Sequence, residues 1–330
     1  MKKSIYIFSS GEIHRKQNTI YFEGERGKKY LPVENVSDIY IFGEVTINKK
    51  LLEYLCQMEV ILHFFNHHGY FTGTFYPRQH YNSGHMILKQ AEFYLDKEKR
   101  LDLARRFTSG AVENIKKVIR YYMNRKISLS SIWDHIENLE KSLKNQNSTE
   151  KIMAIEGNIR EQYYKAFDQI LTNPNFRLEQ RSRRPPVNRL NALISFGNGL
   201  LYVAVLSEIY KTHLDPRIGF LHTTNFRRFT LNLDIAEIFK PIIVDRIIFT
   251  LVNKGMIQPK HFYEEANGIF LKENGRRTFI QELENRLLST IEHRQLKRKV
   301  SYRRLIRLEL YKLEKHLLGE KPYTPFVSRW

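Results

Sequence analysis

The chain has 330 residues, enough for about two domains with buried cores. Lysine and arginine number 54 against 35 aspartates and glutamates, so the formal net charge is +19. This excess indicates a polyanionic partner, with nucleic acid favoured over a membrane surface. The single cysteine, Cys56, excludes an internal disulfide framework and a metal site built from several thiolates of one chain.

No segment at the N-terminus resembles a signal peptide, and we find no apolar run of the roughly eighteen residues that a membrane span needs. We therefore expect a cytoplasmic protein that has no membrane partner.

Short apolar runs that end at turn-forming residues predict a β domain over residues 1–80. These runs cover residues 4–8, 19–22, 38–42 and 60–65, and residues 69–73 form the last hairpin. Leucines at helical spacing interrupt them between residues 48 and 58. We expect a mostly antiparallel sheet, packed as a small sandwich with one helix and closed by Pro77.

From residue 85 to residue 330 the apolar spacing is helical almost throughout. The expected helices cover residues 86–107, 111–126, 129–144, 151–171, 188–213 and 278–318. Ser109-Gly110 separates the first two, and Asn147 followed by Glu150 predicts the N-cap of the fourth. The fold class is therefore α+β, a β-sandwich-like N-terminal domain followed by a larger all-α C-terminal domain.

The predicted helix at 188–213 is apolar on most sides, so we expect it at the centre of its domain. A line of polar residues runs along it, namely Asn188, Asn191, Ser195 and Asn198. Buried polar side chains need partners. These residues can either support a functional site or make ordinary core hydrogen bonds, and the sequence leaves both interpretations open.

Three acids, Asp234, Glu237 and Asp245, follow a lone histidine, His222, in the segment 214–246. Their separations (237 − 234 = 3 and 245 − 237 = 8) place them on one side of a helix, beside its apolar stripe. Carboxylates at such an edge are costly unless they are paired or bound to a cation. With the histidine they suit a hard divalent ion, Mg²⁺ or Mn²⁺. A helix with an acidic solvent edge is the alternative.

Glu156 lies within the apolar stripe of the predicted helix at 151–171. An uncompensated glutamate there would cost roughly several kcal/mol or take up a proton. Gly157 beside it would let another backbone or a ligand approach closely. Glu156 is therefore the best candidate for a third metal ligand, and a buried Glu–Arg pair is the alternative.

Arginines gather in the loop at 177–186, and basic residues recur along the predicted helix at 278–318. The loop arginines are Arg177, Arg181, Arg183 and Arg184. Planar guanidinium groups on a loop suit phosphate contacts, so we expect DNA to bind there. A merely solvated basic loop is the alternative, and the predicted helix forms a second candidate flank for nucleic acid.

Four segments, in this order, resemble the CRISPR-associated protein one family, the metal-dependent integrase that inserts new spacers. They are AIEG at 154–157, PPVNRLNAL at 185–193, LDPRIGFLH at 214–222 and LDIAEIFKP at 233–241. The resemblance covers essentially the whole chain. Thr223 and Lys240 depart from the serine and arginine that are commoner in the family, and neither is expected to touch a ligand.

The resemblance implies that Glu156, His222 and Glu237 ligate Mg²⁺ or Mn²⁺, with Asp234 as a neighbouring active-site acid. It also implies a homodimer built largely through the N-terminal domains, and a small ferredoxin-like companion protein. The implied activity is that of an endonuclease and integrase. In it a 3′-hydroxyl of spacer-precursor DNA attacks a phosphodiester of the CRISPR repeat, which is a transesterification. The alternatives are a metal-dependent nuclease that hydrolyses branched or single-stranded DNA, and a non-catalytic DNA-binding scaffold.

Overall fold

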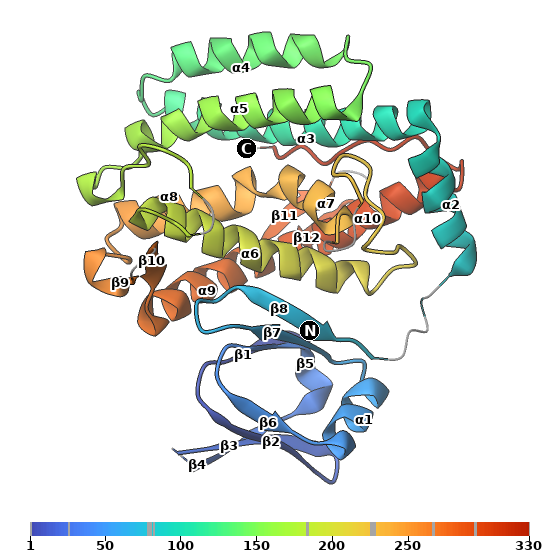
Figure 1. Cartoon of the computed structure of the whole chain (residues 1–330), viewed down its shortest axis with the longest axis vertical. Helices are drawn as coiled ribbons and strands as arrows, with labels where there is room; N and C mark the ends of the chain where they lie inside the picture. Colours follow the sequence, from blue (N-terminus) through green and yellow to red (C-terminus); the bar gives the residue numbers. More distant parts are fainter. Residues whose placement is uncertain are drawn as a thin grey trace. The chain divides into compact units, whose positions relative to one another are not determined.

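The computed structural model describes residues 2–25, 27–77, 81, 83–182, 185–224, 229–265, 268–293 and 296–329. The chain divides into two compact units, Met1–His80 and Tyr81–Trp330. Figure 1 colours the first unit blue and the second from teal to red. The first is rich in strands and the second is mostly helical, so the α+β fold class is confirmed.

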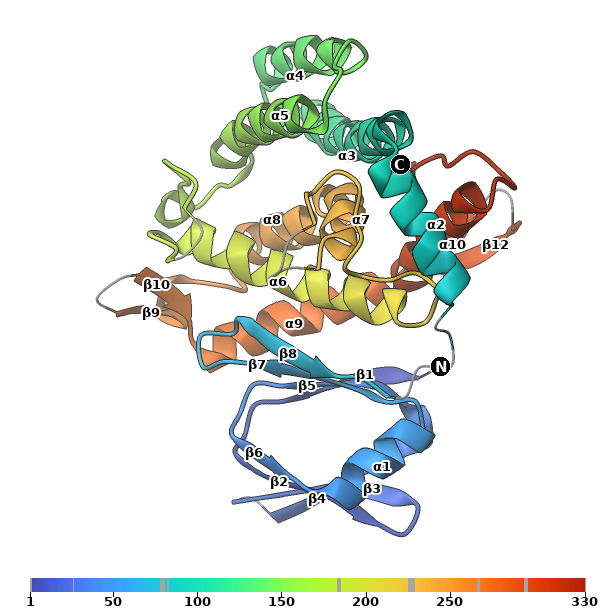
Figure 2. The ribbon, with the colours of Figure 1, turned by 45° about the vertical axis from the view of Figure 1, so that its right-hand side comes forward.

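The first unit is a sandwich of two four-stranded sheets (Figure 2). One sheet has the order β1 (Lys3–Ile7), β5 (Val36–Ile41), β7 (Ile61–Phe65), β8 (Phe71–Phe75). The other has the order β4 (Gly27–Leu31), β3 (Thr19–Gly24), β2 (Gly11–Lys16), β6 (Val45–Ile47). Branched and aromatic side chains of both sheets and of helix α1 (Lys49–Gln57) form the core between them. A short 3-10 turn, Val33–Asn35, precedes β5.

The expectation of a mostly antiparallel sheet was wrong. Strand β5 runs parallel to both β1 and β7, and β2 runs parallel to β6. The chain leaves β1, builds strands of the other sheet and then returns at β5, so the two strands enter their sheet in the same direction. The alternation of apolar residues reports which face is buried and does not report strand direction.

The second unit holds most of the helices. They are α2 (Gly84–Leu95), α3 (Lys97–Met123), α4 (Ser130–Leu143), α5 (Thr149–Ile170), α6 (Arg189–Ile209), α7 (Leu231–Phe239), α8 (Arg246–Asn253), α9 (Glu273–Leu288) and α10 (Tyr302–Leu317). A π-helical turn, Pro241–Asp245, joins α7 to α8, and 3-10 turns lie at Pro174–Phe176 and Pro259–His261. Helix α3 packs against α5 and α7, and α6 packs against α7.

Two short hairpins, which the sequence did not predict, interrupt the helices of this unit. They are β9 (Phe262–Glu265) with β10 (Gly268–Leu271), and β11 (Thr290–His293) with β12 (Arg298–Ser301). The single helix expected at 278–318 is therefore two helices with the second hairpin between them. Four-residue strands are too short for a period of two to stand out from a helical period.

The boundary between the first two helices also differs from the expected one. The break lies at Asp96, whose carboxylate caps α3 by accepting hydrogen bonds from the backbone of Glu98 and Lys99. Gly110 lies inside α3, where a Cβ would come within 2.5 Å of Cβ of Pro325. Gly110 is therefore required by close packing and does not break the helix.

The N-cap of α5 is Ser148, one residue after the predicted Asn147. The Ser148 hydroxyl accepts a hydrogen bond from the backbone of Lys151 at 3.3 Å. Asn147 instead accepts a hydrogen bond from the side chain of Lys151 at 3.1 Å. Serine and asparagine are about equally good caps, so adjacent candidates cannot be ranked by residue type alone.

Helix α6 begins after its N-cap, Asn188, and lies among the other helices of its unit (Figure 1). Contrary to the expectation from the sequence, α6 is long and apolar enough to cross a membrane by length and composition. Its most apolar window is 83% buried inside the domain, which is the behaviour of a core helix. This burial agrees with the central position predicted for the helix.

Candidate metal site

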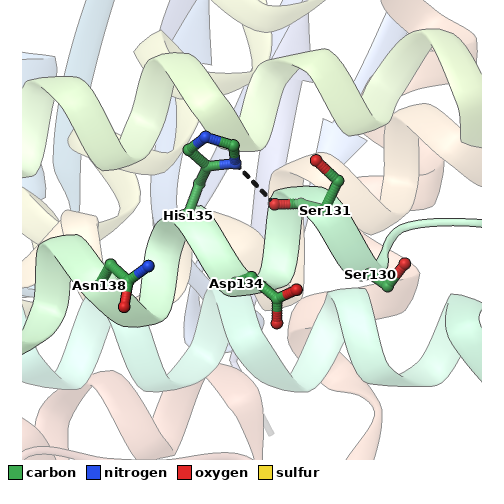
Figure 3. A pocket seen from close by; sticks show the side chains of 5 residues that line it. All are labelled: Ser130, Ser131, Asp134, His135 and Asn138. Atoms are coloured by element: carbon green, nitrogen blue, oxygen red, sulfur yellow. Dashed lines mark hydrogen bonds between the residues drawn. The ribbon is translucent and has the colours of Figure 1, made fainter.

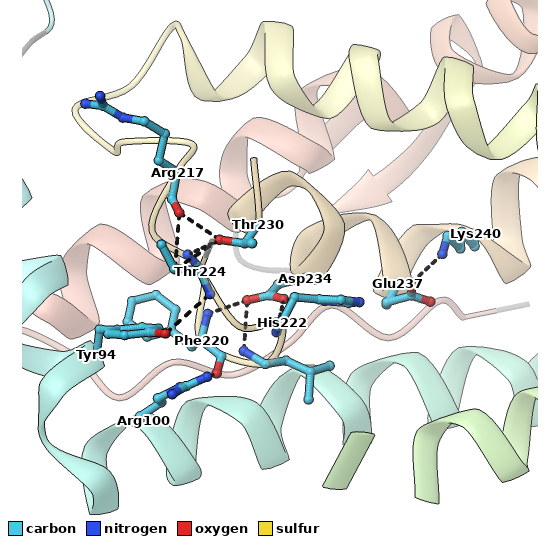
Figure 4. Close-up of polar contacts among 12 residues, drawn as sticks. Tyr94, Arg100, Arg217, Phe220, His222, Thr224, Thr230, Asp234, Glu237 and Lys240 are labelled. Atoms are coloured by element: carbon cyan, nitrogen blue, oxygen red, sulfur yellow. Dashed lines mark hydrogen bonds and ion pairs between the residues drawn. The ribbon is translucent and has the colours of Figure 1, made fainter. Parts of the chain in front are cut away.

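A buried carboxylate ties the loop that carries His222 to helix α7. Asp234 is fully buried, and its two oxygens accept hydrogen bonds from the backbone N–H groups of Phe220 (2.5 Å), Leu221 (3.0 Å) and His222 (3.0 Å) (Figure 4). Three backbone donors satisfy the buried charge and fix the path of the loop.

The close approach of the loop to α7 requires a glycine. A Cβ at Gly219 would lie 2.8 Å from Oδ2 of Asp234 and 2.7 Å from the carbonyl carbon of Thr230. The hydroxyl of Thr230 accepts a hydrogen bond from the Gly219 N–H and donates one to the carbonyl of Arg217, both at 2.8 Å (Figure 4). The start of α7 and the loop therefore form one hydrogen-bonded unit.

The imidazole of His222 is oriented by the same carboxylate. Its Nδ1 lies 2.7 Å from Oδ1 of Asp234, so Nδ1 donates, and in the neutral ring Nε2 keeps its lone pair. Burial lowers the pKa of His222, but the hydrogen bond and the charge of Asp234 outweigh it, and the pKa is raised above 6.5. The side chain is 25% exposed. A histidine held at one nitrogen by a carboxylate is the usual arrangement of a metal ligand.

Glu237 lies one turn after Asp234 and is surrounded by positive charge. Nη2 of Arg160, from α5, donates to Oε2 of Glu237 at 2.6 Å, and Nζ of Lys240 pairs with Oε1. Burial raises the pKa of the Glu237 carboxyl, but Lys240 and Arg160 lower it more, to about 2. The carboxylate is therefore ionised at neutral pH although only 7% of the side chain is exposed.

Glu156 approaches the same cluster from α5. Its Oε1 lies 3.6 Å from Nε of Arg160, so the Glu–Arg pair weighed from the sequence is present. Burial and the negative charge of Glu237 raise the pKa of Glu156, and Arg160 offsets them only in part. No atom lies within 4 Å of the position of a Cβ at Gly157, so no other backbone of the described chain approaches there.

Asp245 reaches Arg160 from the π-helical turn. Its Oδ2 lies 3.8 Å from Nη1 of Arg160, and its side chain is 2% exposed. Burial raises the pKa of Asp245 to about 7, because Arg160 and Lys240 compensate it incompletely. The helical spacing of the sequence was therefore right to group Asp245 with Glu237, while Asp234 faces the loop instead.

The expectation that Lys240 touches no ligand residue was wrong. Its ammonium group pairs with Glu237 and lies 4.8 Å from the ring centroid of Tyr202. The side chain is almost fully buried, and the two contacts hold its charge against α7 and α6. The signal was present in the sequence, because residues three apart on a helix lie on one face.

The structure thus brings two predicted ligands, Glu156 and Glu237, to Arg160, and the third, His222, interacts electrostatically with both. They come from three different elements, and the charge of Glu237 acts on both Glu156 and His222. Two carboxylates and an imidazole nitrogen are a donor set that Mg²⁺ or Mn²⁺ accepts, and His222 and Glu156 keep the set partly open to solvent. The chemistry of these donors therefore suits a divalent ion.

The sequence missed Arg160 and Lys240 as parts of this site, and it missed Gln90. The side chain of Gln90 is fully buried and bonds the backbone of Asp215 and Ile218 at the root of the loop. Arg160 is four residues from Glu156, so the helical pattern could have indicated the pairing. The contact of Gln90 spans about 125 residues and leaves no local signal in the chain.

Arg181 is hydrogen-bonded to polar side chains of α6. Its guanidinium donates to Oδ1 of Asn191 (2.8 Å) and to the hydroxyl of Ser195 (3.3 Å). Asn191 also donates to the carbonyl of Gln180, and Asn188 donates to that of Leu178. These residues of the polar line therefore make core hydrogen bonds that anchor the arginine loop.

Of the other three arginines of that loop, the structure describes only Arg177. Arg177 is exposed, and no hydrogen bond or ion pair to it is found within the described ranges. Arg183 and Arg184 lie outside the described residues. Of the two loop arginines that the structure describes, Arg177 and Arg181, Arg177 is therefore the better candidate for a phosphate contact.

Part of the basic segment at 278–318 is used inside the protein. Arg303 pairs with Glu284 (2.7 Å) and Arg307 with Glu208 (2.6 Å), both between helices. Lys297, Arg298 and Lys299 are exposed in the β11–β12 hairpin. The exposed basic surface thus comes from the hairpin more than from a continuous helix.

A cavity on α4 shares no lining residue with the candidate metal site. Its lining residues are Ser130, Ser131, Asp134, His135 and Asn138 (Figure 3). All five belong to one helix, and His135 already bonds the carbonyl of Ser131 at 2.8 Å. The cavity contains none of the clustered carboxylates, so we assign it no part in the chemistry.

A histidine from a loop and two carboxylates from helices, in a strongly basic chain, are the residue types that a metal-dependent enzyme acting on a polyanion would use. Sequence comparison names the group: residues 5–285 match the family described as CRISPR associated protein Cas1, and the chain belongs to this family. The curated relative CRISPR-associated endonuclease Cas1 2 of Thermodesulfovibrio yellowstonii is 59% identical over 330 residues, which cover 100% of each chain. The resemblance indicated by the four motifs is confirmed.

Solved structures agree on the fold. A Cas1 protein from Thermotoga maritima matches with a TM-score of 0.89 at 49% identity, over 98% of this chain and 99% of that one. A casposase bound to its integration product matches with a TM-score of 0.88 over 99% of this chain and 94% of that one. At 21% identity the second likeness concerns the fold alone.

The raised pKa of Asp245 predicts how stability depends on pH. The folded protein keeps this proton up to a pKa of about 7, whereas the unfolded chain releases it near 3.8, so rising pH between these values favours unfolding. Asp245→Asn removes the titration. The free energy of unfolding of this variant, relative to that of the parent, should therefore rise by roughly 3 kcal/mol between pH 5 and pH 8.

Urea unfolding at several pH values measures this difference. Asp134→Asn is the matched control, because Asp134 is exposed on α4 and should give a difference that does not change with pH. A constant difference for Asp245→Asn as well would contradict the raised pKa.

Proposed function

We propose that the chain is a metal-dependent DNA endonuclease and integrase of CRISPR adaptation, with Glu156, His222 and Glu237 as the ligands of Mg²⁺ or Mn²⁺. One observation carries the proposal: Glu156 of α5 and Glu237 of α7 both pair with Arg160, and His222 of the loop interacts electrostatically with both acids. Membership of a family whose relatives include named endonucleases supports it.

Each residue has a role that follows from its contacts. Nε2 of His222 is available as a ligand because Asp234 holds Nδ1, and the same carboxylate fixes the loop. Asp234 is therefore a positioning acid. Bound at this donor set, the ion would polarise a phosphoryl oxygen and stabilise charge on the attacking or leaving oxygen. Lys240 and Arg160 place two further positive charges beside the carboxylates.

The proposed reaction is a transesterification. A 3′-hydroxyl of the incoming DNA attacks the phosphorus of a phosphodiester in the repeat. A new P–O bond forms, the bond to the leaving 3′-oxygen breaks, and the hydroxyl proton passes to that oxygen or to solvent. No covalent protein intermediate is needed. Hydrolysis of branched or single-stranded DNA is the same displacement with water as the nucleophile, and a product assay separates the two.

The proposed partners are DNA, a second copy of the chain and a small ferredoxin-like companion protein. The net charge of +19 supports the first. Family resemblance supports the other two, with dimer contacts assigned to the N-terminal β domain, residues 1–80. Among the described residues, the outer strands β1, β8, β4 and β6 have a neighbouring strand on one side only, so a second copy could pair with them.

The proposed dimer is tested by measuring the molar mass in solution. Light scattering at micromolar concentration should give about twice the chain mass of 39.5 kDa. A monomer mass that persists across the concentration series would contradict this part of the proposal.

The metal site is tested with Glu156→Gln, His222→Ala and Glu237→Gln. Each removes one ligand, so Mn²⁺-dependent strand transfer should fall by at least about 100-fold while DNA affinity is kept. The rise in melting temperature that Mn²⁺ gives the parent should disappear in each variant. The substrates are a short duplex with 3′-hydroxyl ends and a supercoiled repeat-bearing plasmid, with the companion protein present.

The matched control is Glu161→Gln, an exposed acid five residues along α5 from Glu156. It should transfer strands as the parent does. Full strand transfer by Glu156→Gln would show that Glu156 is only the partner of Arg160, and parental activity without any divalent ion would refute the metal site.

DNA binding is tested with a pair of loop arginines. Arg177→Ala removes an exposed guanidinium, so the slope of log K against log salt should fall by about 1 with stability unchanged. Arg181→Ala should instead lower the free energy of unfolding, because Arg181 holds Asn191 and Ser195. Fluorescence anisotropy over a salt series and urea unfolding provide the two readouts. An unchanged slope for Arg177→Ala would mean that this residue faces away from DNA.

A further inference from the structure

We propose that Asn114, together with the segment at residues 320–329, positions the candidate metal site by holding α7 and the His222 loop against α3. We call this segment the strap. The inference rests on the proposed function, because it concerns the geometry of the same ligands. None of the residues that carry it belongs to the predicted ligand set.

Asn114 is a fully buried residue of α3 that joins α7 to the strap. Its Nδ2 donates to the carbonyl oxygens of Ile238 and Phe326, both at 2.9 Å, and its Oδ1 accepts from the N–H of Ser328 at 2.8 Å. One amide therefore uses both donors and its acceptor on backbone groups of two separate segments. Ile238 follows Glu237 directly, so this contact fixes the backbone beside a proposed ligand.

The backbone at the end of α7 is irregular. After α7 the backbone takes the wider π-helical pattern, in which the N–H of Asp245 bonds the carbonyl of Lys240, and Pro241 has no N–H to donate. The hydrogen-bond pattern is therefore irregular at this helix end, where side chains can supply additional donors to the carbonyl groups. Asn114 provides this for Ile238 in a place that water does not reach.

The strap is itself held by buried contacts. Tyr323 is fully buried and its hydroxyl donates to Oε1 of Glu309, which also accepts from the N–H of Phe326 at 3.1 Å. Nη1 of Arg106 donates to the carbonyl of Tyr323 at 2.6 Å. The strap is thus hydrogen-bonded to α3 through Asn114 and Arg106, and to α10 through Glu309.

Ring contacts extend the strap to both parts of the site. Phe326 stacks on Phe239 of α7, with centroids 5.8 Å apart and planes 9° apart. Tyr323 lies against Phe107, with centroids 5.1 Å apart, and Phe107 stacks on Phe220 of the His222 loop at 6.4 Å. The backbone N–H of Phe220 is one of those that Asp234 accepts. The two elements that carry His222 and Glu237 therefore share one support.

Close packing at Gly110 gives a variant that disturbs this support without removing any polar group. A Cβ there would lie 2.5 Å from Cβ of Pro325 and 3.6 Å from Cγ1 of Ile238. The ring of Pro325 cannot rotate away, so Gly110→Ala must push the strap outward. Lys321→Ala is the matched control, because Lys321 is an exposed residue of the strap.

The experiment compares the parent, Gly110→Ala, Asn114→Ala and Lys321→Ala in the full chain. Binding of Mn²⁺ is followed by the electron paramagnetic resonance signal of the free ion, and DNA affinity and metal-free melting temperature are measured alongside. Residues that orient ligands typically change metal affinity by about 10- to 100-fold when replaced. We expect about 10-fold weaker Mn²⁺ binding for Gly110→Ala and Asn114→Ala, unchanged DNA affinity, and no effect of Lys321→Ala.

A purely structural strap would lower the metal-free melting temperature of the first two variants and leave their Mn²⁺ affinity at the parental value, which would overturn the inference. If either fails to fold, Phe326→Leu replaces it, since it removes only the ring stacked on Phe239. A parent that binds no Mn²⁺ would refute the proposed function, and the inference with it. A parent that binds Mn²⁺ and variants equal to it would refute the inference alone.

Discussion

The candidate site depends on an imbalance of buried charge. Within the part of the chain that the structure describes, Glu156, Glu237 and Asp245 pair with two cations, Arg160 and Lys240, so these ion pairs leave one carboxylate in excess. The imbalance is visible in the opposite directions of the pKa values. That of Glu237 falls to about 2, while that of Asp245 rises to about 7 and that of Glu156 rises as well. A buried cluster with surplus negative charge favours an added cation.

The rest of the second unit keeps these charges in place. Arg160 is buried and forms ion pairs with three acids, which hold its side chain in one position. Lys240 lies between Glu237 and the ring of Tyr202. The π-helical turn shifts the backbone by one residue between Glu237 and Asp245, yet both acids still reach Arg160. Stability and the site geometry therefore rest on the same contacts, and a substitution that removes one cation would leave a buried carboxylate unpaired.

Much of this could be read from the sequence, and the parts that could not have a physical reason. The two-part fold, the helix at α5 and the side of the helix shared by Glu237 and Asp245 follow from periods of two and 3.6 residues. Strand direction in the first unit does not, because β1 and β5 pair across some thirty intervening residues that belong to another sheet. Asn114 and Gln90 were invisible for the same reason: their partners are more than one hundred residues away.

Asp234 shows where spacing alone misleads about function. Its position three residues before Glu237 suggests a second ligand from the same helical face, but its oxygens accept three backbone N–H groups and one imidazole N–H. A carboxylate with four donors has little capacity left for an ion. The four bonds instead convert a loop without secondary structure into a rigid holder for Nε2 of His222. In this site one acid of α7 sets the direction of the imidazole and the next faces the cations, so neither can replace the other.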